Sequence, residues 1–132
     1  MPARSNAQAY QGNMQELSVH IDNIENESGY IVIAIFNEPE NFLSKEDVYD
    51  WRRIKVEGKK SVSFTMKVEK GEYALAVYHD LNNDRALNKS MIGIPQEPYG
   101  FSGRPFTKIR PPKWSDAVIK VDKDESIRIS ID

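Results

Sequence analysis

The segment that decides the fold is residues 60–80, KSVSFTMKVEKGEYALAVYHD. Its first half alternates apolar and polar side chains, which is typical of a strand with one wet face. Its second half, residues 72–79, is apolar on both faces and predicts a strand inside a sheet. The connection between them, residues 69–71, is short and predicts an antiparallel hairpin. The apolar positions of the first half are Val62, Phe64, Met66 and Val68.

The same two patterns recur along the chain. Leu17, Val19 and Ile21 alternate with polar residues, whereas residues 30–36 (YIVIAIF) are apolar on both faces and predict a central strand. Residues 51–57 predict a weak strand. Two final strands are expected at residues 117–121 and 126–131.

Helical periodicity is almost absent. A short helix is expected only within residues 37–50, where Ser44 can cap a turn. Residues 80–115 hold five Pro residues, so regular structure there is expected to be short. The patterns predict an all-β fold, an antiparallel, immunoglobulin-like β-sandwich of about seven strands.

Length and composition exclude several classes of protein. The 132 residues fit one domain, expected over residues 16–132, with residues 1–15 as a flexible leader that lacks the apolar stretch of a signal peptide. A net charge of -2 gives no field that would attract nucleic acid. The chain has no Cys, which excludes disulfides and thiolate chemistry. No apolar run approaches the roughly 20 residues of a membrane helix, so membrane insertion is not expected.

Oxygen-bearing side chains recur after the strand that ends at residue 79. The spacing of Asp80, Asn82, Asp84 and Asn88 is that of short loops that hold Ca²⁺, and predicts a weak, millimolar calcium site. Arg85 and Met91 oppose this, because they stand where such loops need Gly and a bidentate Glu. The alternative is that these side chains bond the loop backbone without metal. His79 is expected to bond loop backbone.

Other residues of the same region are candidates for ligand binding or catalysis. Tyr99 and Phe101 either seal the core or, with Glu97 and His79, form a platform for a sugar or peptide. Asp80 and Glu97 would form a hydrolytic acid–base pair only if the fold brings them within about 5–10 Å. Residues 100–103 lack the G-x-S-x-G spacing of a nucleophile elbow.

A basic stretch follows at residues 104–114, RPFTKIRPPKW. Its four cations and two aromatic rings would suit an anionic partner. The alternative is that the rings lie on the sandwich and the cations point into water.

Two runs resemble a known family. The pattern His79-Asp80-x-Asn82-x-Asp84 and the string IGIPQEPYGFS at residues 92–102 are similar to the signature of the bacterial family called domain of unknown function 2141. The resemblance covers residues 16–132 and implies a small transthyretin-like sandwich, exported to the periplasm or cell envelope. The family's loop carries Gly where this chain has Arg85 and Asp where it has Asn88.

These observations lead to a non-enzymatic binding or accessory module of the bacterial envelope, periplasmic or extracellular, with a protein, small-molecule or carbohydrate ligand. Calcium is the one candidate cofactor. The alternatives are a hydrolase that uses Asp80 and Glu97, and a subunit that binds a protein partner through an exposed sheet edge or the 104–113 loop.

Overall fold

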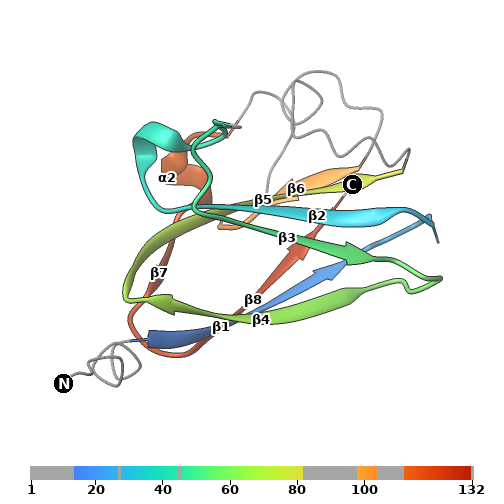
Figure 1. The fold of residues 1–132 in the computed structure, drawn as a ribbon, viewed down its shortest axis with the longest axis horizontal. Helices are drawn as coiled ribbons and strands as arrows, with labels where there is room; N and C mark the ends of the chain where they lie inside the picture. Colours follow the sequence, from blue (N-terminus) through green and yellow to red (C-terminus); the bar gives the residue numbers. More distant parts are fainter. Residues whose placement is uncertain (1–13, 27, 45, 82–97, 104–111, 132) are drawn as a thin grey trace.

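The computed structural model describes residues 14–26, 28–44, 46–81, 98–103 and 112–131, which form two facing β-sheets (Figure 1). The all-β sandwich is therefore confirmed. The only helical pieces in the described chain are η1 (Pro39–Asn41) and α2 (Trp114–Ala117). The strands are β1 (Met14–Asp22), β2 (Tyr30–Phe36), β3 (Asp50–Lys55), β4 (Val62–Glu69), β5 (Gly71–Asp80), β6 (Tyr99–Phe101), β7 (Ile119–Val121) and β8 (Glu125–Ser130).

The strands divide into two sheets. Sheet one has the order β4-β1-β8, and sheet two has the order β3-β2-β5-β6, with β7 paired to the start of β5. Every described ladder is antiparallel except that of β1 with β8, which is parallel. The chain crosses from β7 to β8 at the end of the sandwich where β1 begins, and there the Glu16 amide donates to Asp124 Oδ1 at 2.8 Å. β8 therefore runs in the same direction as β1.

The hairpin predicted between the two halves of residues 60–80 is wrong. Among the described strands β4 pairs only with β1, whereas β5 pairs with β2, β6 and β7. Residues 69–71 form a corner that carries the chain from sheet one to sheet two. The reason lies in burial: β5 is apolar on both faces and belongs to the sheet that is covered on both faces, whereas β4 has one wet face and belongs to the sheet that has one exposed face.

The Tyr73 side chain closes this corner. Its hydroxyl donates to the Glu69 carbonyl at 2.7 Å, and its ring meets Tyr49 edge-on with centroids 5.6 Å apart. Burial, with smaller contributions from Tyr49 and Glu69, raises the pKa of Tyr73 to about 12.

Sheet two is buried on both faces. Alternate residues of β2 and β5 enter two separate apolar clusters, as expected for strands that are apolar on both faces. The inner cluster lies between the sheets, and these two strands supply it with Ile31, Ile33, Ile35, Tyr73, Leu75 and Val77. The outer cluster lies on the far face of sheet two, to which they supply Val32, Ala34, Phe36, Ala74, Ala76 and Tyr78.

Residues 37–44, residues 46–49 and α2 cover part of that outer face. Phe42 lies at the centre, with its ring 5.6 Å from Phe36, 6.5 Å from Phe101 and 6.0 Å from Trp114. The helix expected within residues 37–50 is a single turn, η1, which precedes Ser44. Ser44 accepts a bond from the Glu46 amide at 3.4 Å.

The strands also differ from the prediction in their number and in several boundaries. The short strand β6 was not predicted, because a three-residue strand with a central Gly has no periodicity to read. Ala117 belongs to α2, so β7 is shorter than expected. β1 begins at Met14, inside the segment expected to be a leader. No helix in the described ranges is long and apolar enough to cross a membrane.

Candidate functional site

The candidate site is the rim of sheet two where β5 ends and β6 begins. Tyr78 pairs with Tyr99, and the His79 amide donates to the Pro98 carbonyl at 2.9 Å. Residues 82–97 therefore connect two strands that are hydrogen-bonded neighbours. The predicted site residues Asn82, Asp84, Asn88 and Glu97 lie outside the described residues.

His79 is fully buried and fixes a neighbouring loop to this rim. Its Nε2 lies 2.6 Å from the Ser28 carbonyl oxygen, which can only accept, so Nε2 carries a proton and donates this bond. Nδ1 has no hydrogen-bond partner among the described residues. Gly29 lies against the end of β5, so close that a Cβ on this residue would be 2.6 Å from the Asp80 carbonyl oxygen. The described bond of His79 thus goes to the backbone of the connection between β1 and β2, and a role for His79 in ligand binding stays a prediction.

Asp80 is also fully buried, but it faces the other way. Successive residues of a strand point to opposite faces, so Asp80 shares the face of Tyr78 whereas His79 shares that of Val77. A buried carboxylate requires hydrogen bonds or a cation. Of the predicted metal ligands, Asp80 is the one that the structure describes, and it lies at the start of the oxygen-rich segment.

Tyr99 and Phe101 pack into the outer cluster. Each is 7% exposed, and their rings meet edge-on with centroids 5.8 Å apart. Burial raises the pKa of the Tyr99 hydroxyl. The rings thus occupy the positions expected of residues that seal the core, and a role for them in ligand binding stays a prediction.

Gly100 and Ser102 are structural residues that the sequence did not reveal. A Cβ on Gly100 would lie 2.6 Å from the Ser130 carbonyl oxygen, so glycine allows β6 to lie against β8. The Ser102 hydroxyl is buried, accepts from the Leu75 amide at 2.8 Å and donates to the Ala117 carbonyl at 2.6 Å. The hydroxyl is therefore committed to joining β5, β6 and α2.

No group of three or more His, Asp or Glu side chains that could hold a metal ion occurs among the described residues. The predicted calcium site therefore depends on residues 82–97.

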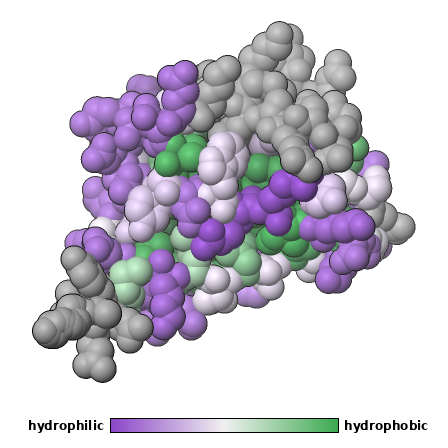
Figure 2. Space-filling model, viewed as in Figure 1, coloured by the Kyte–Doolittle hydropathy of each residue, from purple (hydrophilic) through white to green (hydrophobic). Residues whose placement is uncertain are grey.

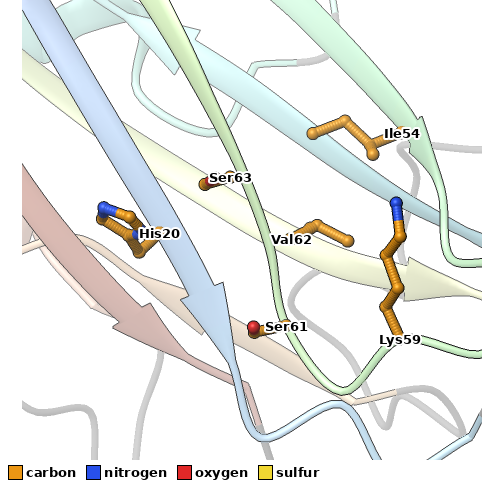
Figure 3. A pocket seen from close by; sticks show the side chains of 6 residues that line it. All are labelled: His20, Ile54, Lys59, Ser61, Val62 and Ser63. Atoms are coloured by element: carbon orange, nitrogen blue, oxygen red, sulfur yellow. The ribbon is translucent and has the colours of Figure 1, made fainter.

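A separate hollow of about 260 Å³ lies between the edges of the two sheets, near the end of β3 and the start of β4 (Figure 3). It is open to solvent, and its walls combine the wet face of sheet one with the edge of β3. The lining residues are His20, Ile54, Lys59, Ser61, Val62 and Ser63.

The fold and the rim define a small all-β sandwich protein in which one long connection joins two neighbouring strands of the doubly buried sheet. The chain belongs to a family of uncharacterized proteins conserved in bacteria (DUF2141), whose family model matches residues 19–129. The resemblance seen in the sequence is thereby confirmed. No match was found among curated proteins or solved structures.

Proposed function

We propose that this protein is a non-enzymatic binding module of the bacterial cell envelope, and that residues 80–103 carry its ligand-binding end. The observation that supports this most is the buried base of the 82–97 segment. His79 and Asp80 are fully buried before it, and Tyr99 is buried just after it. Binding segments are commonly carried between rigid strands in this way.

The bonds of two polar side chains favour binding over catalysis. Among the described residues of this region, Ser102 and His79 have side chains of types that suit a nucleophile and a base, and the Ser102 hydroxyl and His79 Nε2 both bond backbone groups. Each is also buried, so neither offers a reactive atom to a substrate.

We further propose that the 80–88 segment binds Ca²⁺ weakly. Asp80, Asn82, Asp84 and Asn88 would supply the oxygen ligands. The absence of a closing Glu and the presence of Arg85 agree with a Kd of about 1 mM.

Thermal unfolding tests this proposal. A ligand that binds only the folded state raises the midpoint by mass action, so 10 mM Ca²⁺ should raise it by roughly 5 °C relative to a chelator. Asp84→Asn should abolish the rise, because it removes a carboxylate ligand. Asp22→Asn is the matched control, since Asp22 lies on the wet face of sheet one, and it should keep the full response.

Identical melting curves with Ca²⁺ and with chelator would remove calcium from this proposal. The binding role itself is tested separately, by presenting the purified protein to arrays of bacterial glycans and extended peptides. Binding that Tyr99→Ala and Glu97→Ala both leave intact would place the ligand elsewhere. Osmotic-shock fractionation of the host bacterium, with the full-length protein tagged at its C-terminus, tests the envelope location.

A further inference from the structure

The edge of β3 that faces away from β2 has a defined hydrogen-bonding pattern. The Val56 amide donates to the Gly29 carbonyl at 3.1 Å, in register with the β2–β3 ladder. In an antiparallel ladder hydrogen-bonded residues alternate, so the backbone groups of Trp51, Arg53 and Lys55 turn away from β2. Within the described ranges β3 pairs with no other strand.

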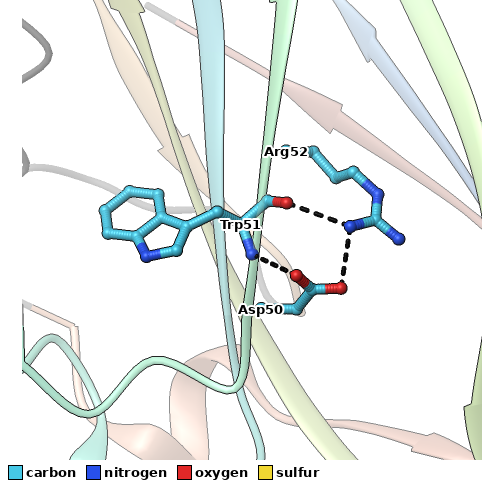
Figure 4. Close-up of polar contacts among 3 residues, drawn as sticks. All are labelled: Asp50, Trp51 and Arg52. Carbon is cyan, nitrogen blue, oxygen red and sulfur yellow. Dashed lines mark hydrogen bonds and ion pairs between the residues drawn. The ribbon is translucent and has the colours of Figure 1, made fainter.

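An ion pair occupies the backbone groups of Trp51 on this edge (Figure 4). The Trp51 amide donates to Asp50 Oδ1 at 2.7 Å, and an Arg52 guanidinium nitrogen donates to the Trp51 carbonyl at 3.0 Å. The same nitrogen lies 2.7 Å from Asp50 Oδ2. Asp50 thus supplies the acceptor, and Arg52 the donor, that the backbone of one residue in a neighbouring strand would otherwise supply.

The same edge carries the two most exposed large apolar side chains of the described surface. Tyr49 is 41% exposed and Trp51 is 39% exposed. The indole lies on the side of the strand opposite to the Asp50–Arg52 ion pair (Figure 4). The edge therefore combines two features. The backbone groups of Trp51 are bonded to side chains that a neighbouring strand can displace, and aromatic surface beside them is open to solvent.

We propose that this edge pairs with the same edge of a second copy of the chain, antiparallel, with the two-fold axis at Trp51. This register places the two Trp51 residues opposite each other, where they exchange both backbone bonds. It also places Asp50 opposite Arg52 of the second copy, and Arg52 opposite its Asp50. The Asp50–Arg52 ion pair within each chain is thus replaced, and the dimer has two ion pairs between the chains instead.

Charge selects this register over its neighbours. An axis at Asp50 would place the two Asp50 carboxylates opposite each other, and an axis at Arg52 would do the same with two guanidinium groups. Like charges directly opposite each other destabilise a strand pair. Only the axis at Trp51 gives opposite charges on both sides of the aromatic pair.

The contact is short, so the dimer is weak, with a Kd of about 10⁻⁵–10⁻³ M. Sedimentation velocity of the wild-type protein from 10 µM to 1 mM, in a chelator, should show a concentration-dependent shift from monomer to dimer. The chelator separates this self-association from the proposed calcium site.

A charge-reversal pair tests the register. Asp50→Arg places cations opposite each other at both ion pairs, and Arg52→Asp places anions there, so each variant alone should dimerise at least about tenfold more weakly. A 1:1 mixture of the two variants should recover to within about threefold of the wild type, because the cations of one chain then face the anions of the other. Recovery in the mixture also shows that both variants are folded.

Arg128→Asp is the matched control. Arg128 forms an ion pair of the same 2.7 Å length with Asp22, on the wet face of sheet one, so its reversal should leave the dimer unchanged.

Cross-linking gives a second test, since the chain has no Cys of its own. Residues of a hydrogen-bonded antiparallel pair have Cα atoms about 5.5 Å apart, which suits a disulfide. Trp51→Cys should therefore form a covalent dimer on mild oxidation, and Lys67→Cys, on the wet face of β4, should not. A wild-type protein that stays monomeric at 1 mM, or variants that all dimerise equally, would overturn the proposal and leave this edge to a strand of another protein.

Discussion

The two sheets of this sandwich differ in how many of their faces are covered. Sheet two is covered by sheet one on the inside and, over part of the outside, by residues 37–44, 46–49 and α2. Sheet one is covered on its inner face, and its other face carries Ser, Thr and charged side chains such as Ser18, Thr65 and Arg128. Figure 2 shows polar side chains over much of the visible surface, with apolar ones between them. The same strand geometry thus produces very different sensitivity to substitution.

The largest difference is expected for buried aromatic residues. Phe36 is fully buried in the outer cluster, where its ring meets Phe42. Phe36→Ala should lower the free energy of unfolding by about 3–5 kcal/mol, because it removes apolar contact and leaves a cavity. The change is measured by urea unfolding followed by circular dichroism.

Phe64 is the comparison in sheet one, since it is half-buried at the edge strand β4 with the Arg52 guanidinium 6.0 Å from its ring. Phe64→Ala should cost less, about 1–3 kcal/mol. If Phe36→Ala leaves no folded protein, Phe36→Leu gives the same ordering with smaller losses. Equal losses at the two positions would show that the outer cluster is not a true second core.

A smaller difference is expected for serine hydroxyls. Ser102→Ala leaves the buried Leu75 amide and Ala117 carbonyl without their partner and should cost about 1–3 kcal/mol. Ser126→Ala, on the exposed face of β8, should change stability by no more than about 0.5 kcal/mol. Urea unfolding of both variants measures the contrast, and a negligible loss for Ser102→Ala would mean that the hydroxyl is not needed to hold α2 on sheet two.

The sequence could predict those parts of the fold in which the signal is local. Alternation in β1 and β4, and the apolar runs of β2 and β5, report burial directly, because side chains of a strand alternate between faces. The partner of each strand is not a local property. Residues 69–71 suit a hairpin and a corner equally well, and the parallel pairing of β8 with β1 depends on where the chain crosses between sheets.

The same distinction between local signals and long-range contacts applies to the candidate site. The sequence could place His79 at the end of a strand, but it could not identify the Ser28 carbonyl as its partner, because Ser28 is distant along the chain. The role of Ser102 could not be predicted, since its partners Leu75 and Ala117 are distant in sequence and its burial depends on β6, a strand too short to be recognised. The oxygen-rich residues could be identified by type and spacing, but spacing alone does not show whether their oxygens converge.

The smallest effect is expected on the wet face of sheet one, and it depends on pH. Asp22 accepts bonds from the Ser130 hydroxyl and the Arg128 guanidinium, which hold its pKa below its usual value of 3.8. A carboxyl whose pKa is lower in the folded state stabilises the protein above its unfolded pKa, and that contribution is lost as the pH falls through the folded value. Asp22→Asn should therefore lower stability by less than about 1 kcal/mol at pH 7, and by progressively less below about pH 4. Urea unfolding at pH 7 and at pH 2 measures this difference, and Asp122→Asn, in the looser 3.7 Å pair with Lys120, is the control. A loss of stability for Asp22→Asn that persists at pH 2 would show that Asp22 acts through packing rather than charge.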